Sequence, residues 1–162
     1  MQLQVSYDPA EDRLLLSLSL DDRNVGFWLT RRLTALLWQV LWQRAGSSVD
    51  ATVHNTAKEW MLRLNQDRAA RALAVSQAPR LQTSAPPLLV TTLQYGPGEK
   101  GGHHLSLIDA AGNGERMNLD DDTLYGLIRL LDEALSNSEW NLQLWRPREA
   151  GDDVSVLAQP LH

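Results

Sequence analysis

The sequence contains no cysteine, and its 162 residues include only two lysines and one phenylalanine. Without cysteine the chain has no disulfide, no thiol nucleophile and no cysteine-ligated metal. Its first residues, MQLQVSYDPAED, lack both a basic start and an apolar stretch, which argues against a signal peptide. No apolar run approaches the roughly 20 residues that a membrane-spanning helix needs. These absences predict a cytoplasmic protein, and thirteen arginines against two lysines are typical of a GC-rich bacterial genome.

The composition is otherwise that of an ordinary globular domain, with 43% hydrophobic and 22% charged residues. A chain of this length can bury a core without covalent staples. The net charge of -5 is uneven, since residues 1–81 carry ten basic and eight acidic side chains and residues 82–162 carry five and twelve. An acidic protein is a poor general binder of nucleic acid, because affinity for the backbone comes from neutralised phosphates. Because the two halves differ in charge, opposite halves of two copies of the chain could attract and orient each other. Exposed charge pairs contribute only about 0–1 kcal/mol each, so they would not hold a dimer together.

Two segments of the sequence, residues 14–43 and 104–133, follow the same plan without a gap. Each consists of a strand, a polar turn, a second strand and an amphipathic helix. The apolar residues that fall on each other are Leu18 and Ile108, Phe27 and Met117, Leu29 and Leu119, Leu37 and Leu127, Val40 and Leu130, and Leu41 and Leu131. This correspondence predicts two similar structural units.

Alternating apolar residues and turn signals predict the strands 2–7, 13–20, 25–29, 88–95, 103–109, 115–119 and 139–145. Three helices are expected. The first is capped by Thr30 and runs to about Ala45, the second covers residues 49–75, and the third covers residues 121–136. The mostly apolar strand 88–95 suits a central position in a sheet.

The predicted fold class is therefore α+β, in a single domain that covers residues 1–162. It contains two pseudo-repeated antiparallel β-meander-plus-helix units, residues 1–46 and 88–145. A long extra helix, residues 49–75, and a linker rich in Pro, Ser and Gln, residues 76–87, lie between them. The two sheets are expected to associate about a pseudo-twofold axis.

Trp38 and Trp42 stand out on the first helix because they lie roughly 140–180° from Leu33, whose face is already apolar. A helix that is apolar nearly all round is buried on both sides. One interpretation is that the helix 49–75 covers both tryptophans. The other is a subunit or partner interface, to which Arg31 and Arg32 near the start of the helix contribute.

Motifs that carry chemistry are weak. Residues 96–101 match the G-x-G-x-x-G spacing, but a strand follows them where a dinucleotide site needs a helix, so a hairpin loop is favoured. His103 and His104 are adjacent on a strand and point to opposite faces, which disfavours a shared metal. The acidic run 120–122 is expected to cap a helix. The sequence predicts no catalytic residue, no cofactor and no metal.

The plan of antiparallel strands followed by a helix, repeated once, resembles the architecture of PUR and whirly single-strand nucleic-acid binders, without shared motif residues. This resemblance implies stacking aromatics on the sheets, for which Tyr7, Trp28 and Tyr95 are the candidates.

The leading hypothesis is a non-enzymatic binding or scaffold module, homodimeric, that acts through a sheet or helix surface. A single-stranded nucleic-acid binder is the alternative, and the net charge disfavours it. An enzyme of unknown type is the third hypothesis, which a cleft that gathers His54 or His104 with an aspartate would support.

Overall fold

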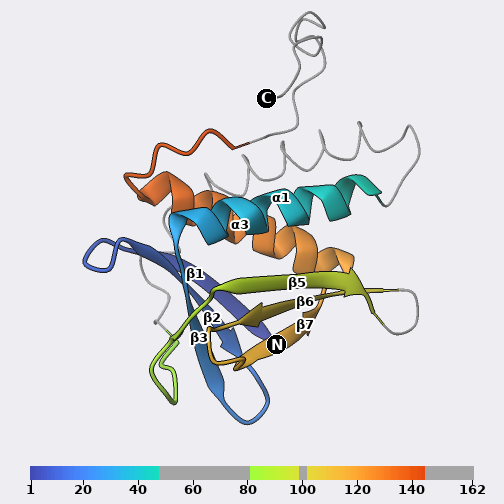
Figure 1. The fold of residues 1–162 in the computed structure, drawn as a ribbon, viewed down its shortest axis with the longest axis horizontal. Coiled ribbons are helices and arrows are strands. Elements are labelled where there is room, and N and C mark those ends of the chain that lie inside the picture. Colours follow the sequence, from blue (N-terminus) through green and yellow to red (C-terminus); the bar gives the residue numbers. More distant parts are fainter. Residues whose placement is uncertain (48–80, 99–101, 145–162) are drawn as a thin grey trace, which may run out of the picture.

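The computed structural model describes residues 1–47, 81–98 and 102–144, which form two sheets and two helices (Figure 1). The strands are β1 Gln2–Asp8, β2 Arg13–Ser19, β3 Asn24–Leu29, β4 Leu88–Leu89, β5 Thr92–Pro97, β6 His103–Ile108 and β7 Gly114–Asn118. The helices are α1 Arg31–Ser47 and α3 Asp121–Asn137. The predicted mixed α+β class is confirmed.

The first sheet has the strand order β1-β2-β3-β4, and its first three strands form an antiparallel meander. Successive side chains of a strand point to opposite faces, so the leucines at every second position of β2 share one face. Leu14, Leu16 and Leu18 are fully buried there. Leu16 lies opposite Val5 on one neighbouring strand and Phe27 on the other, which makes this face the core side of the sheet.

The second sheet is also an antiparallel meander, in the order β5-β6-β7. Its central strand β6 buries Leu105 and Leu107, and Met117 of β7 is the cross-strand partner of Leu105. The loop between β5 and β6 joins two paired strands, and the Gly98 amide donates to the Gly102 carbonyl across it. The G-x-G-x-x-G spacing is therefore part of a hairpin, as expected, and no helix follows it.

The prediction of one central strand over residues 88–95 is wrong. The segment forms two separate strands. β4 ends at Leu89 and pairs in parallel with β3 of the first sheet, whereas β5 begins at Thr92 and pairs with β6 of the second sheet. Both strands are edges of their sheets. The continuous apolar run reflects a segment that passes between two sheets, which sequence pattern alone does not distinguish from a central strand.

Residues 81–87 cross the outer face of the first sheet without forming a helix or strand. The Leu81 amide donates to Gln4 Oε1 at 2.9 Å, and Asn24 Nδ2 donates to the Gln82 carbonyl at 2.8 Å. A Cβ atom built on Gly26 would lie 3.0 Å from Thr83 Cγ2. Glycine at this position therefore lets the crossing segment lie against β3.

The two helices cover both sheets from the same side (Figure 1). Helix α3, which follows the second sheet, contacts β1 of the first sheet, while α1 contacts both β3 and β5. The core is consequently one continuous cluster to which both sheets and both helices contribute. Each helix buries an apolar face against strands that are distant from it in sequence.

Both helices bury side chains at corresponding positions. Counted from Arg31 and Asp121, the shared buried positions are Thr34 and Leu124, Leu37 and Leu127, Trp38 and Ile128, Leu41 and Leu131, Trp42 and Asp132, and Ala45 and Leu135. The Thr30 hydroxyl accepts from the Leu33 amide at 3.3 Å, as the predicted cap of α1 requires.

The register of the strands differs from the gapless alignment by one residue. Phe27 lies opposite Leu16, whereas Met117 lies opposite Leu105. Placing Phe27 on Met117 therefore places Leu18 on Leu107 and not on Ile108. The difference comes from the length of the turn. Four residues lie between Ser19 and Asn24, the paired residues that flank the β2–β3 turn, and five lie between Ile108 and Gly114, which flank the β6–β7 turn.

The predicted strand at 139–145 is not formed over the described residues 139–144. Trp140 is buried and Leu142 and Leu144 pack against the core, with exposed residues between them. The alternation in the sequence thus arises because one side of this segment faces the core. No strand pairs with the segment within the described part of the chain.

The predicted helix 49–75 with His54, the first part of the linker 76–87 and Trp145 lie outside the described residues. Among the residues that the structure describes, neither helix is long and apolar enough to cross a membrane.

Two glycine substitutions are expected to change stability in opposite directions. A Cβ atom at Gly114 would overlap the Leu107 carbonyl oxygen, so Gly114→Ala should lower the free energy of unfolding by about 1–3 kcal/mol. Gly126 lies within α3 and has open space around its Cα, so Gly126→Ala should raise it by up to about 1 kcal/mol. Urea unfolding of both variants measures these changes. Equal changes in the free energy of unfolding would contradict the packing described here.

Candidate functional site

Two groups of polar side chains lie at opposite ends of the helix pair. The first contains Arg31 at the start of α1 and Trp140, which follows the end of α3. The second contains Arg44 in the last turn of α1 and Asp120 at the start of α3. Residues 31 and 44 are separated by roughly 20 Å along a helix that rises 1.5 Å per residue.

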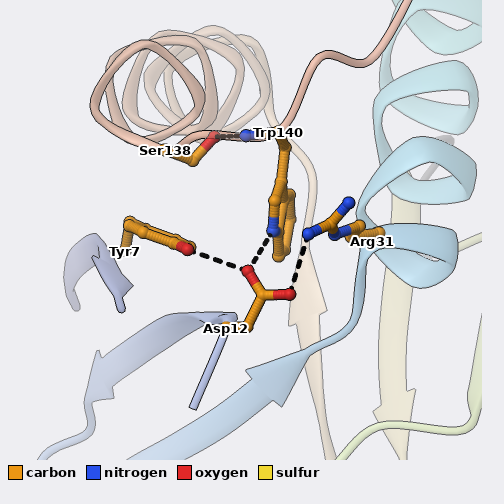
Figure 2. Close-up of polar contacts among 5 residues, drawn as sticks. All are labelled: Tyr7, Asp12, Arg31, Ser138 and Trp140. Atoms are coloured by element: carbon orange, nitrogen blue, oxygen red, sulfur yellow. Dashed lines mark hydrogen bonds and ion pairs between the residues drawn. The ribbon is translucent and has the colours of Figure 1, made fainter. Parts of the chain in front are cut away.

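The first group, here named the Asp12 cluster, consists of Tyr7, Asp12, Arg31 and Trp140 (Figure 2). Asp12 occupies the left-handed region with φ 51° in the turn between β1 and β2, a conformation that aspartate tolerates better than most residues. Asp8 begins this turn by accepting the amides of Ala10 and Glu11. The turn therefore presents the Asp12 carboxylate toward the helices.

Three side chains donate hydrogen bonds to Asp12. Trp140 Nε1 lies 2.6 Å and Tyr7 Oη 2.8 Å from Oδ1, and an Arg31 guanidinium nitrogen lies 2.9 Å from Oδ2 (Figure 2). The Arg31 guanidinium also lies 5.5 Å from the centre of the Trp140 ring, within the range of a cation–π contact. The Tyr7 and Trp140 rings meet edge to face at 5.7 Å.

The hydrogen bonds of the Asp12 cluster change the pKa values of its two acidic groups. The hydrogen bonds from Trp140, Tyr7 and Arg31 hold the pKa of Asp12 below its ordinary value. The hydrogen bond to Asp12 raises the pKa of Tyr7 above its ordinary value. An ionised carboxylate beside a neutral phenol exchanges no proton near neutral pH. The cluster joins the first hairpin, α1 and the segment after α3.

The second group lines a cavity of about 560 Å³ at the end of the second sheet. Its lining residues are Arg44, Gly98, Gly102, His103, His104, Arg116, Asn118, Leu119 and Asp120. They come from the end of α1, the β5–β6 hairpin, β7 and the start of α3. We call this space the basic cavity, because its charged side chains within the described part of the chain are two arginines and one aspartate, beside two histidines.

The aspartate of the basic cavity already has a structural role. Asp120 caps α3 by accepting the Thr123 amide at 2.8 Å, and hydrogen bonds from the Thr123 side chain and amide lower the pKa of Asp120. The carboxylate also interacts favourably with the positive end of the α3 dipole. The acidic run that the sequence analysis assigns to helix capping has this role at Asp120.

His103 belongs both to the cavity and to an aromatic pair. Its ring stacks on Tyr95 with centres 5.4 Å apart and planes inclined by 6°. Tyr95 is 37% exposed, and burial raises its pKa while the charge of Arg44 lowers it, so that cation lies within electrostatic range of the stack. Among the described residues His103 Nδ1 is buried without a hydrogen-bond partner. One of the residues that line the cavity therefore has its ring held in an aromatic stack.

The residues predicted to form an interface are not brought together. Trp38 and Trp42 are 1% and 5% exposed, their rings meet edge to face at 6.0 Å, and both belong to the core. Arg31 lies in the Asp12 cluster, and Arg32 is exposed. A partner surface made by the two tryptophans would have to replace the contacts that bury them in this chain.

The three aromatic residues proposed for nucleic-acid stacking also lie apart. Tyr7 is paired with Leu14 and Trp28 with the adjacent Leu15, so the two side chains point to opposite faces of the first sheet. Tyr95 lies on the second sheet. Of the three, Tyr95 alone lies beside the basic cavity.

The sequence analysis placed His103 and His104 on one strand, and both line the cavity. Within the described residues no three His, Asp or Glu side chains lie close enough to hold a metal ion. Arg44, Arg116 and Asn118 were missed, as were Asp12 and Trp140. No local signal marks them, because Asp12 and Trp140 are 128 residues apart and the cavity is formed by four separate segments.

Comparison with known proteins gives no assignment, since no family model, no curated protein and no solved structure matches this chain.

The Asp12 cluster predicts a pH-dependent loss of stability. A carboxyl group whose pKa is lowered by folding stabilises the protein above its ordinary pKa of about 3.9, and this contribution disappears as the pH falls through the folded-state pKa. Asp12→Asn keeps a residue that tolerates the left-handed turn but removes the charge. The variant should unfold at lower urea concentration than the wild type at pH 7, and the difference should shrink between pH 4 and pH 2.

Asp21→Asn, at an exposed position in the turn between β2 and β3, is the matched control and should leave the midpoint nearly unchanged. An Asp12→Asn difference that is constant with pH would show that the ionised carboxylate does not fasten the structure.

Proposed function

We propose that the protein is a non-enzymatic binding module of the bacterial cytoplasm, and that the basic cavity holds an anionic group of its ligand. The observation that carries this proposal is the composition of the cavity lining: two arginines, two histidines and an asparagine from three separate elements, α1, β6 and β7. A volume of about 560 Å³ falls in the usual range of small-molecule sites. The cavity thus has the size and the polar groups of a binding site.

The hydrogen-bonding capacity of the lining favours an anion. Arginine has five N–H donors and no acceptor, and its planar guanidinium matches carboxylate and phosphate groups. Arg44 and Arg116 supply two such groups, and the Asn118 amide adds further donors. Asp120, the one carboxylate among the described lining residues, already accepts the Thr123 amide. A ligand that contributes acceptors complements this surface best.

Neighbouring acidic residues limit the affinity for a simple anion. Asp121 and Asp122 occupy the first turn of α3, and both are exposed. Each repels an anion weakly, because exposed charges are screened by water and salt. Dissociation constants in the millimolar range are therefore expected for small anions.

An enzyme is the second candidate, because the basic cavity gathers His104 with Asp120 as that hypothesis requires. Three observations favour binding over catalysis. The lowered pKa of Asp120 makes it a weak base near neutral pH, and among the described residues its carboxylate makes no hydrogen bond or ion pair with either histidine. The lining also contains no serine, threonine or lysine within the described residues.

We also propose that the two β-meander-plus-helix units are a true internal repeat. Both have the order of three antiparallel strands followed by a helix, and their helices bury corresponding positions. The one-residue difference between the second turns accounts for the shifted strand register.

Self-association into a homodimer is proposed for the same module. The more basic first half and the acidic second half of the chain are complementary in charge, which orients two copies. Since Trp38 and Trp42 are buried, the exposed part of α1 available to a second copy includes Arg32 and Leu36, and Leu36 is 41% exposed. The second copy is the occupant that we assign to this face.

Sedimentation velocity tests the dimer. The wild type should sediment as a dimer at about 50 µM, and Leu36→Lys should shift it toward the monomer, because a charge then replaces an apolar contact. Asn141→Lys introduces the same charge at another exposed position and should have no effect. A wild type that is strictly monomeric would refute self-association.

Anion binding is tested by two-dimensional NMR titration with inorganic phosphate and with citrate. Amide shifts should be largest at Gly98, Gly102, His104 and Asn118. Arg116→Ala should weaken binding about tenfold, since a charge-assisted hydrogen bond contributes roughly 1.5–3 kcal/mol.

Arg32→Ala is the matched control, because it also removes one exposed arginine but lies at the other end of α1. Equal weakening by both substitutions, or shifts spread evenly over the surface, would contradict the proposed site.

A further inference from the structure

We propose that the anionic ligand of the basic cavity is a nucleoside phosphate, in which a flat base lies next to His103 and the phosphate lies between the arginines. This inference rests on the proposed function and adds the chemical class of the ligand. Two features of the cavity carry it: the Tyr95–His103 ring stack and the pair of guanidinium groups.

The ring stack provides a surface for a planar group. The Tyr95 and His103 rings are nearly parallel, with an interplanar angle of 6°, and His103 lines the cavity. Nucleic-acid bases stack on aromatic side chains irrespective of their sequence, because every base has a π face. A base in the cavity meets a ring whose orientation is already fixed by Tyr95, so little side-chain freedom is lost on binding.

The cations provide the contact for the phosphate. Arg44 and Arg116 reach the cavity from α1 and β7, and Arg44 lies within electrostatic range of Tyr95 and also of Tyr125 on α3. A guanidinium on each of two elements allows the phosphate to be held while the base lies on the stack. Neither a carboxylate nor a free phosphate uses the ring.

The same geometry limits the ligand to about one nucleotide. A long single strand is read by several aromatic side chains along a continuous groove. Here Tyr7 and Trp28 point to opposite faces of the first sheet, and Tyr95 belongs to the second sheet. One base and its phosphate match the Tyr95–His103 stack and the volume of the cavity.

Isothermal titration calorimetry of the full chain with adenosine 5′-monophosphate and with ribose 5-phosphate separates the base from the phosphate. The two probes carry the same phosphate and sugar, and one of them lacks the ring. The nucleotide should bind about tenfold more tightly than the sugar phosphate. Tyr95→Leu should remove most of this ratio, and Tyr95→Phe should keep it, because phenylalanine preserves the stack without the hydroxyl.

The outcomes distinguish this inference from the function on which it rests. If both probes bind equally and Arg116→Ala weakens both, the cavity is an anion site and the nucleotide assignment is wrong. If neither probe binds, nor phosphate, nor citrate, both proposals fail. A ratio that Tyr95→Leu leaves unchanged would also overturn the assignment, and the thermal midpoint of each variant shows whether it is folded.

A seven-nucleotide strand of deoxyadenylate identifies the source of the nucleotide. If the strand binds no more than tenfold more tightly than the mononucleotide, the ligand is a free nucleotide. If the strand binds much more tightly and its affinity falls steeply with salt, the ligand is a nucleic-acid strand of which one nucleotide occupies the cavity. Strand binding that is independent of Tyr95 and Arg116 would overturn the assignment of the cavity.

Discussion

The structure depends on the way in which each helix packs against strands that do not precede it directly. Helix α3 lies on β1, and α1 lies on β5 as well as β3, so neither meander has a complete core without the other unit. A three-stranded sheet exposes one apolar face and needs a covering layer. Here both covering layers are shared, which makes the two units mutually dependent and fixes the relative position of the two sheets.

The helix pair also determines where polar chemistry can occur. At one end, the Asp12 carboxylate joins Tyr7, Arg31 and Trp140, and this cluster holds the start of α1 to the segment after α3. At the other end, Arg44 and Asp120 reach the basic cavity. At the first end the polar side chains bond to one another, whereas at the second end they line a cavity. This difference is the physical reason for assigning structure to one end and binding to the other.

Much of the fold could be predicted from local pattern, because the alternation in β2 and the spacing in α3 both report which side of an element is buried. The same rule also explains the errors. Residues 139–144 alternate but pair with no described strand, and the apolar run at 88–95 passes between two sheets. Periodicity reports burial and carries no information about the hydrogen-bonding partner. The cavity could not be predicted, since its residues meet only after both units have folded.

Hydrogen exchange measured by NMR across a urea titration tests the shared core most directly. If the two units form one cooperative structure, the amides of Leu16 in β2 and Leu107 in β6 should open with the same free energy and the same dependence on urea. Leu41→Ala in α1, expected to cost about 2–5 kcal/mol, should lower both values equally. Loss of protection in one sheet while the other stays folded would contradict the account.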